Sequence, residues 1–450
     1  MDVELLRKYN VPGPRYTSYP TVPCWSRTPS TDEWRQHVRG ALSASNRTDG
    51  ISLYVHLPYC ESLCTYCGCN TRITVNHAVE GPYIASVLKE WQLYRSLFSE
   101  APRIRELHLG GGTPTFFSPT NLEKLVEGLL HGCKVTSDVE MGFEGHPNNT
   151  TLEHLRRLYD LGFRRVSYGI QDFDPKVQDT IHRIQPFENV ERAFRDAREV
   201  GYTGINADLV FGLPFQTKDS MRRTIALTNQ LRPDRIAFYS YAHVPWIKPG
   251  QRKFTEADLP ADAEKRALYE LGKQLFEEAG YQEIGMDHFA LPHDALNTAM
   301  LRGQLHRNFM GYTPVHTELM IGLGVSAISD SWTCFAQNRK TVEDYQQAVE
   351  RGELPVFRGH VLSEKDLRVR KEILNAMCRF EADLANIGWD EHDVEAHFFD
   401  LIDDGLVVQH GTRICVTAKG RPFVRNVCMA FDLQLSAEEE NRKPRFSMTV

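Results

Sequence analysis

Three closely spaced cysteines are the strongest chemical signal in the sequence. Cys60, Cys64 and Cys67 fall in the segment YVHLPYCESLCTYCGCN, with three and then two residues between them. Thiolates at such short spacings can hold an iron–sulfur cluster from a single loop. Three ligands on a four-iron cluster leave one iron free to bind another molecule. Cys69 follows closely and could serve as a fourth ligand.

Two other kinds of cysteine site fit this spacing less well. A structural zinc site normally takes four ligands, and the sequence offers no clear distant pair to complete one. With Cys69 as a fourth ligand, the segment would form an ordinary electron-transfer cluster. The other six cysteines are scattered, and we interpret them as buried structural residues rather than as a disulfide framework.

A second motif is the run Gly110-Gly111-Gly112-Thr113-Pro114, which directly follows the apolar segment IRELHL. Glycines at the end of a strand let the backbone approach a ligand closely and leave amide and carbonyl groups free to bind it. The run differs from the dinucleotide-binding pattern G-x-G-x-x-G, because Pro114 interrupts the expected start of a helix. Taken alone, the run is typical of a tight turn.

Polar residues end three further apolar segments, where their burial is costly without a partner. They are Glu144 in GFEGHP, Gln171 and Asp172 in SYGIQDF, and Asp208 in NADLVFGLP. Each alone fits a cap or a turn equally well. Together they favour a shared pocket, in which Arg183 could neutralise a carboxylate through a bidentate contact.

The segments that carry these motifs alternate between strand and helix patterns. Six apolar runs are predicted to be strands, at 51–57, 104–109, 139–143, 165–170, 205–211 and 235–241. Between them lie segments of helical periodicity, at 83–97, 122–130, 152–161, 189–200 and 220–230. This alternation predicts an α/β fold of parallel strands, either a barrel or an open doubly wound sheet. Both architectures place their chemistry at the carboxyl ends of the strands, where the motifs above fall.

The chain divides into three predicted parts. Residues 1–45 form an arm that is predicted to be extended after Val11, because Pro12, Pro14 and Pro20 interrupt helices. Residues 46–335 hold the alternating α/β segment and its extension. Residues 336–450 turn to helical patterns and end in the strand-like pair VVQHG and TRICVT, which predicts a mostly helical, winged-helix-like domain.

The composition is that of an ordinary globular protein, with 41% hydrophobic and 25% charged residues. A net charge of −7 argues against a nucleic-acid partner, since phosphate backbones are bound by basic surfaces. The first twenty residues lack the apolar run of a signal peptide, and no stretch approaches the ~18 apolar residues of a membrane span. We therefore expect a cytoplasmic protein that binds neither nucleic acid nor membranes.

Several motifs together resemble known enzymes. The C-x3-C-x2-C spacing with an aromatic residue before the third cysteine, here Tyr66, resembles the radical S-adenosylmethionine (SAM) superfamily. The glycine run resembles the motif with which that superfamily holds the methionine amino group of SAM. Over nearly the whole chain, ten segments in order are similar to the oxygen-independent coproporphyrinogen III oxidases: PGPRYTSYPT, YVHLP with the cysteines, HLGGGTPT, GIQDF, GLPFQT, YSYAHVP, GMDHFA, LHRNF, GLGVSAIS and GRPFVRN.

The resemblance implies a partial (βα)6 barrel that binds one 4Fe-4S cluster and two SAM molecules. It also implies conversion of two propionates of coproporphyrinogen III into vinyl groups, which gives protoporphyrinogen IX in haem biosynthesis. A 5′-deoxyadenosyl radical would abstract hydrogen at each propionate β-carbon. The resemblance further implies a reductant such as flavodoxin or ferredoxin and an electron acceptor, and we expect a monomer.

Matching positions carry over the family's binding residues as expectations. The cluster would be held by Cys60, Cys64 and Cys67. The first SAM would contact Tyr54, Gly111, Glu144, Ala242 and Ile328. The second would contact Tyr66, Gly112, Thr113, Gln171, Arg183 and Asp208. The arm would close over substrate, where Arg15 suits a propionate, and catalysis is expected to involve Tyr54, Glu144 and Arg15.

Two positions depart from the family pattern. His146 stands in Glu144-Gly145-His146-Pro147, where the family has an acidic residue. Met310 stands where the family has glutamine, so a hydrogen-bonding amide is replaced by a thioether. We expect Met310 to lie near the second SAM.

Two other functions are compatible with parts of the sequence. A paralogue on the same scaffold would use the second SAM as a carbon donor, as a radical methylase or cyclopropanase. A related haem-binding chaperone would use His243, His288 or His306 as a ligand, although a histidine among apolar neighbours is more often a core residue. The arm PRYTSYP and the polar pocket favour the decarboxylase, and the arm and Cys69 argue against the chaperone.

Overall fold

A computed structural model describes residues 3–246, 248–435 and 446–449. Six strands run parallel and side by side in the order in which they occur along the chain. They are β1 (Ile51–Leu57), β4 (Arg103–Gly111), β5 (Lys134–Gly145), β6 (Arg165–Gln171), β7 (Gly204–Phe211) and β8 (Arg235–Ser240). All six coincide with predicted strands, which confirms the parallel α/β fold.

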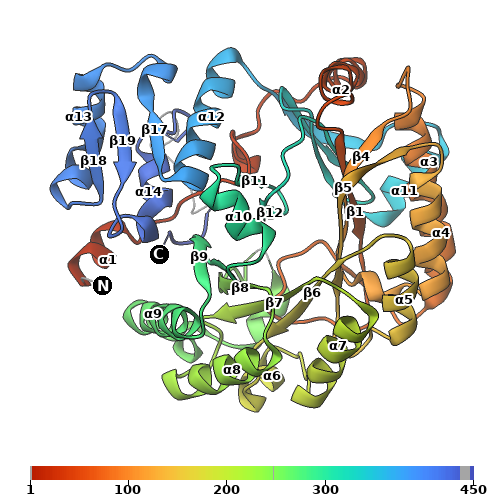
Figure 1. The fold of residues 1–450 in the computed structure, drawn as a ribbon, viewed down its shortest axis with the longest axis horizontal. Coiled ribbons are helices and arrows are strands. Elements are labelled where there is room, and N and C mark those ends of the chain that lie inside the picture. Colours follow the sequence, from red (N-terminus) through yellow and green to blue (C-terminus); the bar gives the residue numbers. More distant parts are fainter. Residues whose placement is uncertain (1–2, 247, 436–445, 450) are drawn as a thin grey trace.

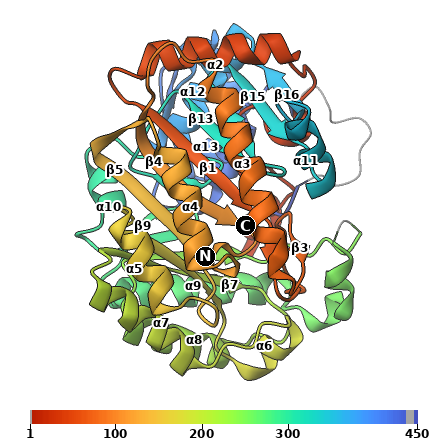
Figure 2. The same cartoon turned by 90° about the vertical axis from the view of Figure 1, so that its right-hand side faces the viewer.

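Helices follow these strands and cover one face of the sheet, as Figures 1 and 2 show. They are α3 (Glu80–Arg95), α4 (Pro119–Leu130), α5 (Leu152–Asp160), α6 (Pro175–Thr180), α7 (Phe187–Val200) and α8 (Lys218–Leu231). β1 is buried along nearly its whole length. This agrees with its apolar sequence, because strands that are buried on both faces are continuous apolar runs. Leu107 and Leu109 of β4 pack in the same core as Val87 and Trp91 of α3.

The parallel strands are extended on both sides, and together they form a twelve-stranded sheet. Beside β1 lie β13 (Met320–Leu323), β14 (Ile328–Asp330), β15 (Cys334–Asn338) and β16 (Val356–Val361). Beyond β8 lie β10 (His288–Ala290) and β9 (Gln282–Gly285), both antiparallel to their neighbours. The sheet thus ends at β16 and β9 instead of closing on itself, which is a partial barrel. The predicted boundary after residue 335 falls inside β15, and the division into domains stays a prediction.

Further helices and short strands complete this part of the chain. The helices are α9 (Asp262–Glu278), α10 (Ala295–Leu301) and α11 (Val342–Glu350). Two small ladders pair β2 (Tyr59–Cys60) with β3 (Arg72–Ile73), and β11 (His306–Asn308) with β12 (Gly311–Thr313).

The prediction of an extended arm up to residue 45 is wrong over its last third, where α2 (Thr31–Ser45) forms. Prolines constrain only their neighbours, and the last of them before this helix is Pro29. Ser30 and Glu33 form a capping box at its start, and Trp34, Val38 and Leu42 bury one face at helical spacing. A short helix, α1 (Val3–Tyr9), precedes the arm.

Residues 10–30 form an arm that is anchored on the C-terminal part of the chain. Pro12 pairs with Met448 in an isolated β-bridge. The buried guanidinium of Arg425 donates to the carbonyl of Pro14 at 2.8 Å, and the Tyr16 hydroxyl donates to Asp432 at 2.9 Å. The two ends of the chain therefore hold each other in place.

The C-terminal part is a small helical unit, and its hydrophobic core is shared with α1, the arm and residues 284–312. Its helices are α12 (Glu364–Arg379), α13 (Glu391–Asp403) and α14 (Val424–Met429). The predicted hairpin forms as β18 (Val407–His410) and β19 (Arg413–Val416), and β17 (Glu381–Asp383) adds a third strand beside β19. Helices with a small antiparallel sheet confirm the winged-helix-like prediction, and Figure 1 shows this unit in blue.

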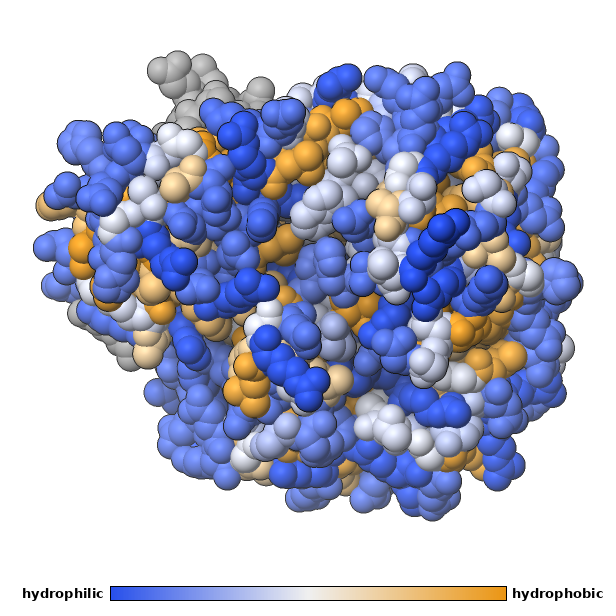
Figure 3. All heavy atoms as spheres, turned by 45° about the horizontal axis from the view of Figure 1, so that its top comes forward, coloured by the Kyte–Doolittle hydropathy of each residue, from blue (hydrophilic) through white to orange (hydrophobic). Residues whose placement is uncertain are grey.

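Within the residues described, no helix combines the length and the apolar character needed to cross a membrane. The face drawn in Figure 3 is largely hydrophilic, with apolar side chains scattered in small groups.

Candidate active site

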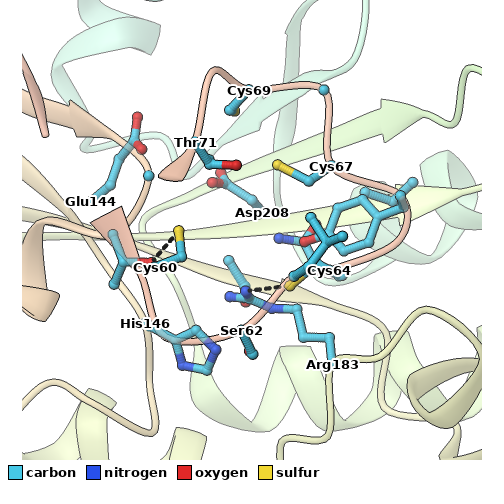
Figure 4. A pocket seen from close by; sticks show the side chains of 18 of the residues that line it. Cys60, Ser62, Cys64, Cys67, Cys69, Thr71, Glu144, His146, Arg183 and Asp208 are labelled. Atoms are coloured by element: carbon cyan, nitrogen blue, oxygen red, sulfur yellow. Dashed lines mark hydrogen bonds between the residues drawn. The ribbon is translucent and has the colours of Figure 1, made fainter. Parts of the chain in front are cut away.

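The cysteine loop joins β1 to α3 and folds back on itself. The ladder between β2 and β3 closes it, with the Thr74 amide donating to the Cys60 carbonyl at 2.9 Å. Inside the loop, the Cys67 amide donates to the Cys64 carbonyl at 3.1 Å, which makes a tight turn. Figure 4 shows the sulfurs of Cys60, Cys64 and Cys67 around a common space at the carboxyl ends of the strands.

This space belongs to a cavity of about 790 Å³ that contains most of the residues predicted to bind cofactors. Its lining includes Arg15, Cys60, Cys64, Tyr66, Cys67, Cys69, Gly111, Gly112, Thr113, Glu144, Gln171, Arg183, Asp208 and Ala242. The strands β1 to β8 therefore bring together residues from Cys60 to Ala242, which are 182 positions apart in the sequence. This convergence follows from parallel strands, whose carboxyl ends meet at one edge.

The donor set fits a cluster better than a single metal ion. Among residues 3–246, 248–435 and 446–449, no three Cys, His, Asp or Glu side chains gather closely enough to hold one ion. A four-iron cluster is several ångströms across, so its thiolates stand farther apart. Thiols on one loop, beside an arginine and a glycine turn, are the groups such a cluster needs.

The thiols differ in their surroundings. Burial raises the pKa of Cys60 to about 11, whereas a hydrogen bond from Cys69 lowers the pKa of Cys67 to about 6. Cys64 accepts a hydrogen bond from Arg183 Nη1 at 3.5 Å, and Cys60 Sγ lies 3.3 Å from Thr113 Oγ1. A cationic donor beside sulfur stabilises its thiolate form, which is the form that binds iron.

The glycine run forms the turn at the end of β4. Gly111 adopts φ 114°, and its amide donates to Glu144 Oε2 at 3.2 Å. The Gly112 amide donates to the Leu57 carbonyl of β1 at 2.8 Å. A Cβ atom on Gly112 would lie 2.6 Å from the Pro58 backbone, so only glycine fits this close approach. The turn leaves room beside the cysteine loop for a ligand.

Glu144 ends β5 and presents its carboxylate to the cavity, with 43% of the side chain exposed there. His108 Nε2 lies 3.6 Å from Glu144 Oε1, and the Tyr54 ring stacks on the His108 ring with centroids 6.2 Å apart. Burial alone would raise the pKa of Glu144, but His108 and the Gly111 amide hold that pKa below its usual value. The carboxylate is thus kept charged, as binding of an ammonium group requires.

Arg183 lies beneath the cysteine loop and also donates to the Gly169 carbonyl at 2.6 Å. Its Nε atom is buried and has no hydrogen-bond partner among the residues that the structure describes. Asp208 accepts from Ser167 Oγ at 3.2 Å, and burial together with nearby Glu144 raises the pKa of Asp208 to about 7. Gln171 ends β6 with φ 70°, a left-handed conformation that is strained for a residue other than glycine.

Arg15 of the arm reaches the opposite wall of the cavity. It forms an ion pair with Asp287, and its guanidinium lies 5.7 Å from the centre of the Tyr239 ring. Ala242 follows β8, and its carbonyl accepts from Gln251 Nε2 at 3.2 Å.

Two predicted contacts do not line the cavity. Tyr54 lies behind the glycine turn, where its ring approaches Gly110, and Ile328 begins β14 on the far side of β13. Of the two departures from the family pattern, His146 lines the cavity and Met310 does not. Met310 sits between β11 and β12, where its amide donates to Asn308 Oδ1 at 2.9 Å.

Other residues of the site were not predicted from the sequence. His108 faces Glu144 from within β4, where strict alternation along IRELHL is its only signal. Gln251 bridges the carbonyls of Ala242 and Tyr66, and Lys248 Nζ donates to the Cys69 carbonyl at 3.1 Å. Both lie on the loop after β8, and nothing in the sequence links this loop to the cysteines.

Comparison with known proteins agrees with this geometry. The model of the Radical SAM superfamily matches residues 54–228. The chain is 37% identical to the oxygen-independent coproporphyrinogen III oxidase of Helicobacter pylori J99, over 100% of this chain and 99% of the relative. It is 38% identical to the enzyme of that name from Escherichia coli K12, over 100% and 98%.

The solved structure of coproporphyrinogen III oxidase from Escherichia coli, described as a radical SAM enzyme, superimposes with a TM-score of 0.88 at 37% identity. The alignment covers 96% of this chain and 98% of that one. By identity over its full length, the protein belongs to the oxygen-independent coproporphyrinogen III oxidase family of radical SAM enzymes.

Proposed function

We propose that the protein decarboxylates two propionates of coproporphyrinogen III to vinyl groups, which gives protoporphyrinogen IX in haem biosynthesis. The observation that carries this proposal is the convergence of Cys60, Cys64 and Cys67 with the glycine turn and Glu144 in one cavity. The relatives that match the chain from end to end are named for this activity.

When bound, a 4Fe-4S cluster and SAM would supply the radical chemistry that removes a hydrogen atom from the propionate β-carbon. Cys60, Cys64 and Cys67 would hold the cluster. Arg183 donates a hydrogen bond to the Cys64 sulfur, and the tight fit of Gly112 against Pro58 sets the distance between the glycine turn and the loop. Each vinyl group then requires loss of one carbon dioxide and one electron, which an unidentified acceptor takes.

The surroundings of the predicted SAM contacts support two binding positions. Glu144, charged and aimed into the cavity, suits the amino group of a first SAM together with the Gly111 backbone. The unpaired Nε of Arg183 suits an anionic group of a second SAM, with Gln171 and Asp208 beside it. Tyr54 acts through the His108 ring, on which it stacks, and Ile328 would need a ligand that extends past the cavity.

The arm is the proposed cover of the substrate. Arg15 lines the cavity and is 37% exposed, so a propionate can reach its guanidinium beside Asp287. Coproporphyrinogen III carries four propionates, two of which remain after the reaction and can serve for orientation. Arginine binds carboxylates through paired donors, which suits this task.

The proposed setting follows from the same chemistry. One tight group of cysteines with the others scattered along the chain is typical of a protein in a reducing compartment such as the cytoplasm. One-electron delivery calls for a carrier of the flavodoxin or ferredoxin class. We also propose that the protein works as a monomer.

The test is anaerobic incubation of the iron-reconstituted protein with coproporphyrinogen III, SAM and a chemical reductant. We expect one protoporphyrinogen IX, two carbon dioxides and two 5′-deoxyadenosines per substrate. The matched pair of variants is Cys60→Ser, which should form no product, and Cys415→Ser, which changes a thiol on β19 far from the cavity.

Two outcomes would contradict the proposal. Cleavage of SAM without any vinyl product would show that the chain acts on another substrate. A methylated or cyclopropanated porphyrin or other product would assign the chain to the paralogous carbon-transfer reaction.

A further inference from the structure

One edge of the cysteine loop reaches the protein surface. Gly68 and Cys69 are exposed, whereas Cys60, Cys64 and Cys67 are half-buried. Two hydrogen bonds fix this edge to other parts of the fold. Lys248 Nζ donates to the Cys69 carbonyl at 3.1 Å, and Asn70 Nδ2 donates to the Lys340 carbonyl at 3.0 Å. The loop is also exposed at residues 61–63, but these hydrogen bonds attach the Gly68–Cys69 edge to Lys248 and Lys340.

We call four basic residues near this edge the basic collar: Arg72, Lys248, Lys340 and Arg358. Lys248 and Lys340 are hydrogen-bonded to the loop, and Arg72 follows Asn70 by two positions. Burial lowers the pKa of Lys340, and the nearby positive charges of Arg358 and Lys248 lower it further. Among the neighbouring acids, Glu343 pairs with Arg72 at 3.1 Å, with both side chains more than half exposed. Because the whole chain carries −7, this positive surface is a local feature.

Two large apolar side chains stand exposed beside the collar. Trp246 is 59% exposed on the loop after β8, two positions before Lys248. Phe357 of β16 is 55% exposed, and Lys340 Nζ lies 6.0 Å from its ring centre. In Figure 2, β3, α11 and the green loop after β8 lie along the same side of the molecule. Exposed aromatic residues among basic ones are typical of a protein-binding surface.

We propose that the basic collar, with Trp246 and Phe357, is the docking surface for a small acidic one-electron carrier protein of the flavodoxin or ferredoxin class. The inference rests on the proposed function, which requires an electron at the cysteine loop. A complementary charged surface steers such a carrier and fixes its orientation, and the aromatic side chains supply close contact.

The electron balance is simple. Each reduced carrier gives up one electron and leaves oxidised, and that electron enters the protein through the exposed edge at Cys69. One electron supports cleavage of one SAM to methionine and, after hydrogen abstraction, 5′-deoxyadenosine. Docking at the collar shortens the path, because the edge lies two residues from Cys67.

The experiment uses the full iron-loaded protein and the variant Arg72→Glu/Lys340→Glu, which reverses two exposed charges outside the cavity lining. The control is Lys124→Glu, the same change on the exposed side of α4. Formation of 5′-deoxyadenosine is measured without porphyrinogen, once with reduced flavodoxin or ferredoxin and once with dithionite. Binding of each carrier is measured by calorimetry at low and at physiological salt.

We expect the double variant to bind both carriers about tenfold more weakly and to lose carrier-driven SAM cleavage in proportion. Its dithionite-driven rate should equal that of the parent, because a small reductant needs no docking surface. The binding of the parent should weaken with salt. Trp246→Ala should lower carrier affinity without changing its salt dependence.

Two outcomes would overturn the docking surface. The double variant could retain carrier affinity, or it could lose the dithionite-driven rate equally. Because SAM cleavage is scored without porphyrinogen, failure of the docking surface is distinct from failure of the proposed decarboxylation.

Discussion

The two ends of the parallel strands carry different chemistry. The carboxyl ends hold thiols, glycines and isolated polar groups around a cavity of about 790 Å³. The amino ends border a second cavity of about 650 Å³, lined by Arg103, Arg105, Asp138 and other residues. There the charges pair within the protein, as between Arg105 and Asp138 at 3.2 Å. One end is built to bind ligands, and the other is built to hold the strands together.

The largest expected effect is at the ligand-binding end. Cys64→Ala removes one of the three proposed cluster ligands, so SAM cleavage should fall to background and the iron content should drop. Cys334→Ala, a buried cysteine of β15 outside the cavity, is the control and should keep both. Iron analysis and 5′-deoxyadenosine formation are the measurements. Full activity in Cys64→Ala would show that SAM cleavage does not depend on the cysteine loop.

Arg183→Met should lower kcat/KM for SAM cleavage by about 100-fold, the scale on which loss of a buried cationic donor affects catalysis. Arg183→Lys keeps the charge without the paired donors, and its kcat/KM for SAM cleavage should lie between those of the parent and Arg183→Met. Iron content should remain at the parent level in both variants. Arg192→Met, on the exposed side of α7, serves as the control. Equal losses for Lys and Met would mean that geometry, not charge, is what Arg183 provides.

At the amino ends, Arg235→Met should act on stability instead. Arg235 Nε donates to Asp294 at 2.7 Å, and both side chains are buried. The variant leaves this buried carboxylate with Arg165 at 3.5 Å and the Leu296 amide at 2.7 Å. We expect a loss of about 3 kcal/mol in the free energy of unfolding, measured in urea. SAM cleavage per folded molecule should be unchanged. Arg351→Ala, which breaks an exposed ion pair, should cost far less stability.

The smallest expected effect is a pH dependence of protein stability that arises from His146. Burial, with the nearby charge of Arg183, lowers the pKa of His146 to about 2, so the folded protein does not take up the proton that the unfolded chain binds below about 6.5. Its contribution to stability is therefore complete above pH 6.5 and is lost as the pH falls. Between pH 7 and pH 5.5 this amounts to at most about 1 kcal/mol.

His146→Asn keeps an acceptor for the Asn148 amide and removes the titrating ring. Urea unfolding at the two pH values should therefore show a smaller loss of stability for this variant than for the parent. An identical pH dependence in both proteins would contradict the assignment.

The sequence predicts the centre of the fold better than its margins. The six parallel strands are long apolar runs, and all of them form where predicted. The flanking strands β10 and β14 have three residues each, too few to show a period, and they form because a neighbouring edge offers hydrogen bonds. α2 forms despite the prolines that precede it, because its sequence is amphipathic and Ser30 caps its first turn.

The same contrast applies to the site. Cysteines, glycines and strand-end acids reach the cavity because strand direction places them there, which the sequence pattern predicts. Gln251 and Lys248 reach it only through the path of the loop after β8, which no local pattern predicts. Met310 is expected near the second SAM but lies outside the cavity lining, because its position depends on the hairpin of β11 and β12.

The central claim is that Cys60, Cys64 and Cys67 alone hold the cluster and leave one iron open to SAM. It is tested most directly by iron and sulfide analysis of anaerobically reconstituted Cys69→Ser, with SAM binding followed by electron paramagnetic resonance. We predict four irons per chain and a change of the signal on addition of SAM, as in the parent. Loss of the cluster in Cys69→Ser, or an electron paramagnetic resonance signal that does not change on addition of SAM, would make Cys69 a fourth ligand and contradict the account.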